Sequence, residues 1–194
     1  MASAWLILAV LCALGARCRV GSAALTAEAS SFRRPDLAAY QGVEKCTSPG
    51  ATWYVLYRNE KEGSFGAHDN CLRDTQMSKV VDAKGRFRVR YGYGHERNAT
   101  FTYKSSDGRS YNILQTQLDG VSGVGKYDML FVDCAHCKIV KDQKSSKCLI
   151  SVRESSLRHG VPRHCHFLYD LLCGTSPKYQ VSDSSCLDND AKLG

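Results

Sequence analysis

The chain has 194 residues, ten cysteines and a formal net charge of +7, with 43% hydrophobic and 23% charged residues. This length fits one domain, and the apolar fraction suffices for a packed core. The basic residues are spread along the chain without a long lysine or arginine run, so nothing in the charge pattern indicates nucleic acid as a partner.

The first apolar segment, Trp5–Leu14, is followed by small residues at Ala13-Leu14-Gly15 and Ser22-Ala23-Ala24. It is too short for a membrane helix, which needs about 20 residues, but has the length of a signal-peptide core. We therefore expect residues 1–24 to be a secretory signal peptide, with the cut between residues 15 and 24. Residues 25–194 should form a single domain that is secreted, extracellular and not membrane-bound.

Alternation of polar and apolar residues predicts β-strands along most of the chain. From Arg86 to Tyr91 every second residue is arginine and the others are apolar, so the strand has one cationic and one apolar face. Eight such runs follow one another with short turns, which favours an all-β, eight-stranded antiparallel up-and-down barrel that can hold a small ligand. The expected strands are Thr52–Arg58, Cys71–Val81, Gly85–Tyr93, Ala99–Ser105, Ser110–Leu118, Lys126–Asp133, His136–Lys141 and Cys148–Arg153.

Helical patterns occur only near the ends of the predicted domain. Pro35–Tyr40 predicts a short N-terminal helix, and Pro162 precedes a C-terminal helical pattern that Gly174 can end. The order of helix, eight strands and helix is typical of a lipocalin.

The cysteines and a sequon agree with export. Cleavage of the signal peptide removes Cys12 and Cys18 and leaves eight cysteines, an even number that predicts four disulfides in a secreted chain. Asn98-Ala99-Thr100 is a sequon, so we expect Asn98 to be glycosylated.

The chain resembles the salivary lipocalins of ticks, the group that includes the histamine-binding proteins. The resemblance rests on TWYVLYR (Thr52–Arg58), RVRYGYGHERNATFTYKSSDGRSY (Arg88–Tyr111), YDMLFVDCAHCKIVK (Tyr127–Lys141) and CLISVRESSL (Cys148–Leu157), in that order. It implies two disulfides, Cys71–Cys186 and Cys137–Cys165. Four cysteines remain, for which we expect Cys46–Cys173 and Cys134–Cys148.

The resemblance also bears on the ligand. Amine-binding members carry acidic residues at two positions that are Lys138 and Leu149 here, and a tryptophan where Ser151 stands. Histamine and serotonin are cations, and a cation inside a barrel needs a buried carboxylate partner. The chain is therefore expected to bind amines poorly unless Asp133 compensates.

A lipid mediator such as a leukotriene or thromboxane is the preferred expectation, because Lys138 or Arg153 can meet its carboxylate while apolar walls take its chain. The ligand-binding candidates are Tyr57, Phe87, Tyr91, Phe101, Tyr103, Tyr127, Phe131, Asp133, Lys138, Leu149 and Arg153, and Trp53 is expected to close the bottom of the barrel.

The predicted role is thus sequestration of a host inflammatory or haemostatic mediator by a monomer that needs no cofactor. Two alternatives remain: an amine bound through another carboxylate, or a filled barrel that binds a host protein, such as a complement protein, through the cationic strip of Arg86, Arg88 and Arg90.

Enzymatic and metal-binding functions find little support. Cys134-Ala135-His136-Cys137 has a thioredoxin-like spacing but precedes a strand rather than a helix. The same motif with His164, Cys165 and His166 is a weak zinc pattern, since secreted cysteines favour disulfides. No nucleophile motif or phosphate-binding loop occurs, so we expect neither a metal nor catalysis.

Overall fold

A computed structural model of the chain describes residue 33 and residues 35–63, 70–92 and 94–188. The expected signal peptide, residues 1–24, lies outside the described residues. No helix among the described residues is long and apolar enough to cross a membrane.

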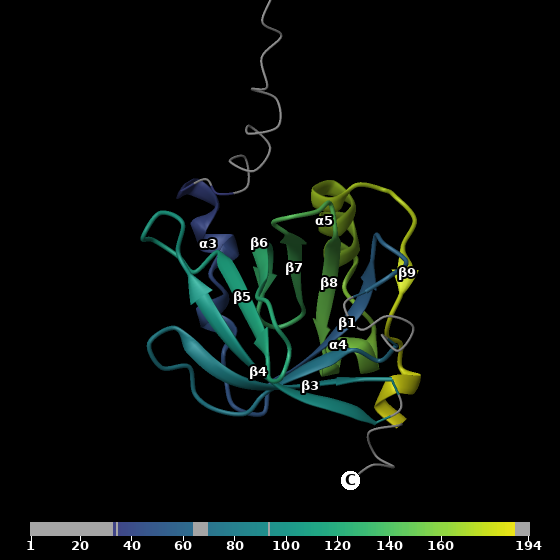
Figure 1. Ribbon diagram of the computed structural model, residues 1–194. Coiled ribbons are helices and arrows are strands. Elements are labelled where there is room, and N and C mark those ends of the chain that lie inside the picture. Colours follow the sequence, from purple (N-terminus) through teal and green to yellow (C-terminus); the bar gives the residue numbers. More distant parts are fainter. Residues whose placement is uncertain (1–32, 34, 64–69, 93, 189–194) are drawn as a thin grey trace, which may run out of the picture. The chain divides into compact units, whose positions relative to one another are not determined.

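Eight strands form the body of the fold, with short helices before and after them (Figure 1). The strands are β1 (Thr52–Arg58), β2 (Arg73–Gln76), β3 (Lys84–Tyr91), β4 (His95–Lys104), β5 (Ile113–Leu118), β6 (Gly125–Asp133), β7 (Cys137–Asp142) and β8 (Cys148–Arg153). The helical elements are η1 (Pro35–Leu37), α3 (Ala38–Gln41), η2 (Val43–Cys46), α4 (Glu154–His159) and α5 (Arg163–Cys173), and a two-residue strand, β9 (Tyr179–Gln180), follows them.

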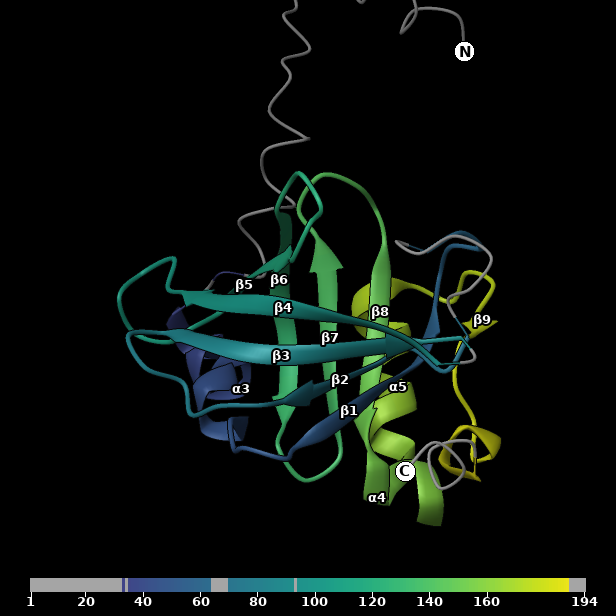
Figure 2. The same cartoon turned by 60° about the horizontal axis from the view of Figure 1, so that its bottom comes forward.

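The sheet closes on itself. Each strand from β2 to β8 pairs antiparallel with the next, β8 pairs with β1, and β1 pairs back to β2. Figure 2 shows β3 and β4 crossing β7 and β8 on the opposite wall. This closure leaves the barrel strands without unpaired edges. The expected eight-stranded antiparallel up-and-down barrel with helices at both ends is confirmed.

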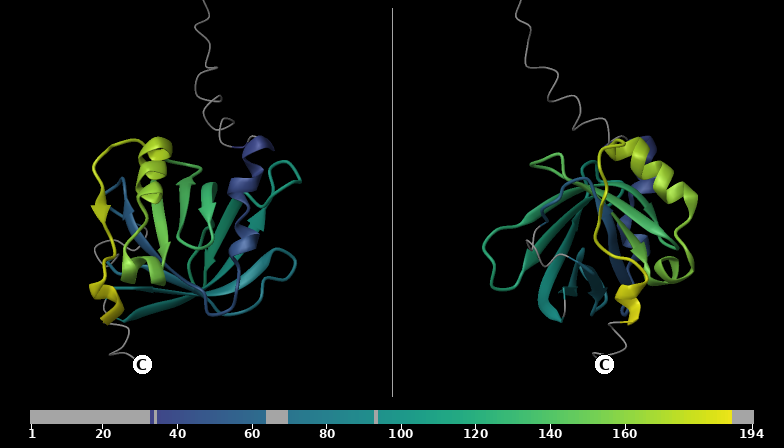
Figure 3. Two further views of the ribbon diagram at one scale, coloured as in Figure 1. Left: turned by 180° about the vertical axis from the view of Figure 1, so that it is seen from behind. Right: turned by 90° about the vertical axis from the view of Figure 1, so that its right-hand side faces the viewer.

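The buried apolar side chains form two clusters, one inside the barrel and one outside it. The inner cluster includes Phe87, Phe101 and Met129. The outer cluster lies beneath α5 and includes Ile139, Ile150 and other side chains that alternate with the inward ones. Figure 3 shows α5 against the outer wall, so both faces of β7 and β8 are covered.

Several element boundaries differ from expectation: β4 begins at His95 rather than Ala99, and β5 begins at Ile113 rather than Ser110. The predicted strand Cys71–Val81 is reduced to β2, because Cys71 has a φ of 52° and the chain turns at Asp82 and Ala83, which also have positive φ. Helix α4 follows β8 directly and was missed, since its six residues are too few to show a helical period.

Four disulfides join the eight described cysteines. Cys71–Cys186 and Cys137–Cys165 are present as the family resemblance implied. The other two expected pairs are wrong, because the structure contains Cys46–Cys134 and Cys148–Cys173. Helix α5 runs along the outer wall and brings its last residue, Cys173, to the first residue of β8, with 5.9 Å between the Cα atoms. Cys46 ends η2, which packs against β6 and so meets the turn that holds Cys134.

Removing disulfides should destabilise the protein in the order of the loops they close. Replacing Cys71 and Cys186 with alanine opens a crosslink between residues 115 apart, against 25 for Cys148 and Cys173. We expect the first pair to lower the free energy of unfolding by about 4 kcal/mol, about 1 kcal/mol more than the second. Guanidinium unfolding measures both, and the reverse order would show that loop closure does not govern their contribution.

Candidate ligand-binding site

The barrel encloses a cavity of about 410 Å³ whose wall is mainly apolar. The loop between β5 and β6, residues 121–124, and Lys144 in the loop between β7 and β8 also line it, so these loops surround its mouth. The apolar side chains on its wall are Val55, Leu72, Val89, Phe101, Leu114, Leu118, Val140 and Leu149. Such a cavity has the size and lining of a small-molecule site.

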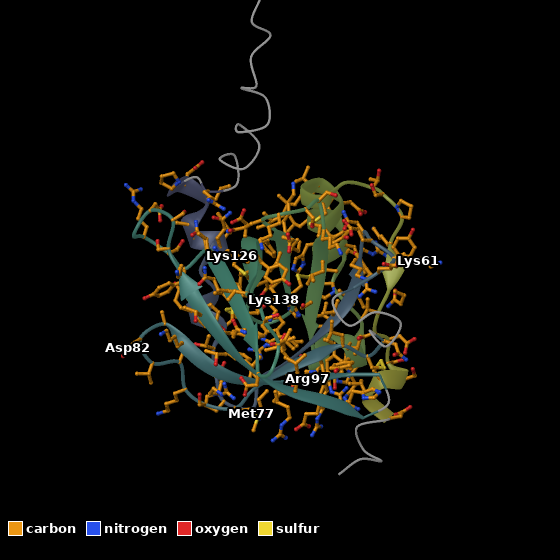
Figure 4. The ribbon with its side chains drawn as sticks, in the orientation of Figure 1. Lys61, Met77, Asp82, Arg97, Lys126 and Lys138 are labelled. Atoms are coloured by element: carbon orange, nitrogen blue, oxygen red, sulfur yellow. A yellow bond between two sulfur atoms is a disulfide. The ribbon has the colours of Figure 1, made fainter. Side chains whose placement is uncertain are left out.

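A buried ion pair stands on the cavity wall. Asp74 of β2 and Lys138 of β7 both line the cavity, and the Lys138 Nζ lies 3.4 Å from Oδ1 and 3.5 Å from Oδ2 of Asp74. Their side chains are only 9% and 13% exposed for Lys138 and Asp74 respectively. Figure 4 shows Lys138 near the centre of the barrel, whereas Lys61 and Asp82 lie at its periphery.

Burial favours the neutral form of both members of the pair. It raises the pKa of the Asp74 carboxyl, with Lys138 opposing the shift, and lowers the pKa of the Lys138 ammonium, with Asp74 opposing it. Each charge therefore depends on the other, because neither has bulk water to solvate it.

Trp53 carries two cations over its ring. The Lys138 Nζ lies 4.9 Å and the Arg153 Cζ 4.3 Å from the ring centroid. Arg153 also donates a hydrogen bond from Nε to the carbonyl oxygen of Cys134, at 2.9 Å. Tyr103 lies near Asp74. The pKa of the Tyr103 hydroxyl is raised, mainly by burial and to a smaller extent by the negative charge of Asp74. The cluster thus contains two cations, one carboxylate and two aromatic side chains.

Several predicted site residues do lie inside the barrel. Phe101, Tyr127, Lys138 and Leu149 line the cavity. Phe87 stacks on Phe101, with 4.1 Å between ring centroids, and Tyr103 is buried in the same inner cluster. Tyr91 packs against that cluster from the end of β3, where its ring stacks on His95 at 5.5 Å. Arg153 does not line the cavity; its guanidinium lies over the ring of Trp53.

Two β-bulges place three other candidates outside. The register of β1 shifts between Val55 and Tyr57, and that of β6 between Met129 and Phe131. An extra residue in a strand reverses the alternation beyond it, so Tyr57 and Phe131 join the outer cluster. The Tyr57 hydroxyl is hydrogen-bonded to Nδ1 of His166 on α5, with 3.0 Å between the two atoms. Burial raises the pKa of the Tyr57 hydroxyl to about 12. Asp133 accepts a hydrogen bond from the backbone N–H of Ala135 and lies 3.2 Å from His164.

The strip of arginines on β3 is largely neutralised. Arg86 pairs with Asp119 at 2.6 Å, and Arg88 and Arg90 share Glu96 at 3.1 and 2.8 Å. The strip therefore offers an acidic protein partner less free charge than the sequence pattern indicates. Asn98, the expected glycosylation site, is exposed on β4.

The cysteines of the redox and zinc hypotheses form disulfides in the structure. Cys134 and Cys137 pair with different partners, so their C-x-x-C spacing does not form a redox pair. Cys137, His164 and Cys165 have their ligand atoms within 4.8 Å of one another, but both sulfurs belong to one disulfide. A zinc ion needs thiolates, which these sulfurs do not supply.

Breaking the ion pair should cost stability in a pH-dependent way. In Lys138→Met, Asp74 is left buried without its partner, and we expect the free energy of unfolding to fall by about 3 kcal/mol at neutral pH. Burial raises the pKa of Asp74 in the folded protein above its value of about 4 in the unfolded chain. The loss of stability is therefore complete at a pH above the folded-state pKa, where Asp74 is charged, and it disappears as the pH falls towards 4, where Asp74 is protonated in both states.

Urea unfolding of Lys138→Met at neutral pH and near pH 4 measures this effect, with exposed Lys61→Met as the matched control. A loss that persists unchanged in acid would mean that Lys138 stabilises the barrel by packing and not as a counter-ion.

Comparisons with known proteins agree with this geometry. Residues 31–188 match the family described as tick histamine binding protein. AM182, solved as a serotonin complex, has a TM-score of 0.57 at 14% identity, covering 74% of this chain and 90% of that one. Japanin from Rhipicephalus appendiculatus, bound to cholesterol, has a TM-score of 0.54 at 12% identity, covering 70% and 96%. Lobster apocrustacyanin A1 has a TM-score of 0.51 at 11% identity, covering 75% and 83%.

A comparison with curated proteins finds no match. The structural likenesses, all at low identity, establish the fold alone. The family match extends from before η1 to the end of the described residues and includes all eight barrel strands and all four disulfides. The chain is a ligand-binding lipocalin and belongs to the tick histamine binding protein family.

Proposed function

We propose that this lipocalin is secreted in saliva and sequesters a host lipid mediator in its barrel. The ligand is an amphipathic lipid of leukotriene or thromboxane type, with its apolar chain against the cavity wall and its polar end at Lys138. The observation that carries the proposal is a largely apolar cavity of about 410 Å³ with the Asp74–Lys138 ion pair on its wall.

The apolar wall supports a lipid over a small amine. Aliphatic side chains from β1, β3, β5, β7 and β8 line the cavity, and burying a hydrocarbon chain against them contributes about 25 cal/mol for each Å² removed from water. A biogenic amine has too little apolar surface to use such a wall and depends on its charge. Its affinity therefore depends on a free carboxylate.

The charges of the polar cluster also disfavour an amine. Asp74 is the carboxylate that sequence reasoning did not identify, but Lys138 already neutralises it and Arg153 adds a second positive charge nearby. A cationic ligand would have to displace Lys138 from Asp74 and would then lie close to two cations, the buried Lys138 and the half-buried Arg153. An anionic head group would instead meet a net positive charge, because the cluster contains two cations and one carboxylate.

Sequestration needs no catalytic group. A binder that is abundant and releases its ligand slowly removes a mediator from circulation without chemical turnover. The disulfides and the covered outer wall support this role, because they hold the barrel rigid around the cavity and reduce the ordering cost of binding.

Filling the cavity should weaken lipid binding. Leu149→Trp places a large side chain on the wall, and we expect at least a tenfold loss of affinity for arachidonic acid or a leukotriene, measured by native mass spectrometry and fluorescence competition. Leu171→Trp is the matched control, because Leu171 is 66% exposed on α5 and should leave binding unchanged.

The same measurement includes histamine and serotonin, for which no adduct is expected. A stable amine adduct with no lipid adduct would reverse the proposed ligand class. The absence of any adduct would favour a protein partner instead.

A further inference from the structure

The ion pair on the cavity wall determines what happens to a proton when a lipid acid binds. A ligand carboxylate in this cavity would pair with the Lys138 ammonium, but Lys138 is already paired with Asp74. Both groups line the cavity, so a ligand that enters can reach them. The two Nζ to carboxylate-oxygen distances, 3.4 and 3.5 Å, lie at the long end for hydrogen bonds. The pair is thus held by charge more than by tight hydrogen bonding, and one carboxylate can replace another.

We propose that Asp74 is a specificity-determining residue that takes up a proton when a lipid carboxylate binds to Lys138. Before binding, the Asp74 carboxylate faces the Lys138 ammonium. After binding, the ligand carboxylate faces the ammonium and Asp74 is a neutral carboxylic acid, the proton coming from solvent. Charge balances, since one negative charge enters the cavity and one proton neutralises another. The inference rests on the proposed function, because it requires a ligand in this cavity.

The surroundings of Asp74 favour this outcome over two ionised carboxylates. The groups that face it are Lys138 on β7, Arg153 on β8 and Tyr103 on β4. When the ligand occupies Lys138, Arg153 remains nearby and its positive charge opposes protonation of Asp74, but its guanidinium donates to a backbone carbonyl and lies over Trp53 instead of pairing with Asp74. Two carboxylates sharing one ammonium in a largely apolar cavity repel each other, so one takes up a proton. Burial already raises the pKa of Asp74 before any ligand enters.

This exchange distinguishes ligands by their head group. A lipid alcohol of the same chain leaves the ion pair intact and binds without a proton. A lipid acid binds with one proton, so its affinity falls by up to about tenfold for each pH unit as the pH rises above neutrality, whereas the affinity of the alcohol stays constant. Asp74 therefore disfavours acids progressively in alkaline solution.

Calorimetry tests the proton count. Arachidonic acid and arachidonyl alcohol, each below the concentration at which it aggregates, are titrated into the full secreted protein in buffers of different ionisation enthalpy. We expect about one proton taken up per acid and none per alcohol. Acid binding without proton uptake overturns the inference while leaving the proposed function intact. If neither probe binds, the proposed function fails and the inference fails with it.

Infrared difference spectroscopy identifies the group that holds the proton. Arachidonic acid labelled with ¹³C at its carboxyl group separates the ligand's bands from those of the protein. We expect an unlabelled carboxylic-acid band on binding that is missing in Asp74→Asn and retained in Asp133→Asn, a control carboxylate outside the barrel. Binding of the alcohol shows that Asp74→Asn is folded. A carboxylic-acid band that shifts with the label means that the ligand carries the proton and Asp74 stays paired, which overturns the inference.

Discussion

The ion pair between Asp74 and Lys138 joins two strands that are distant in the sequence and places two buried charged side chains on the wall of the cavity. Charges in such a place persist only when they are paired, because isolated burial costs several kcal/mol per ion. The pair therefore requires a closed barrel that holds β2 and β7 in fixed positions. It also restricts the ligand, since any charged head group must compete with a partner that is already bound.

The scaffold explains how the pair is kept in place. The β1–β2 pairing closes the sheet, and disulfide Cys71–Cys186 anchors the chain just before β2. On the other side, Cys137 precedes Lys138 directly and is bonded to Cys165 of α5. Alternation in β7 sends Cys137 outward to the helix and Lys138 inward to the cavity. One disulfide thus sits beside each member of the pair.

Most of the fold was predictable from the sequence, because a half-buried strand must alternate. The bounds of β1 and β8 agree with expectation, and the closed antiparallel barrel is confirmed. The site was less predictable for a specific physical reason. Alternation fixes a side chain's direction only until a bulge occurs, and bulges in β1 and β6 turned Tyr57 and Phe131 to the outer wall. Nothing in the local sequence marks either bulge.

Asp74 was missed because the segment Cys71–Val81 alternates poorly and forms only four strand residues. One signal was present: Asp74 is the single acidic residue in that segment. The pairing of four cysteines was also beyond sequence reasoning, since it depends on where η2 and α5 cross the barrel wall. Lys138, in contrast, was identified through the family resemblance, although its partner was not.

The decisive measurement is a crystal structure of the protein with arachidonic acid. We expect density for the lipid inside the barrel, with its chain along Leu114 and Val140 and its carboxylate within hydrogen-bonding distance of the Lys138 Nζ. A lipid found only on the outer wall, with the Asp74–Lys138 pair undisturbed and the cavity filled by the protein's own side chains, would contradict this expectation.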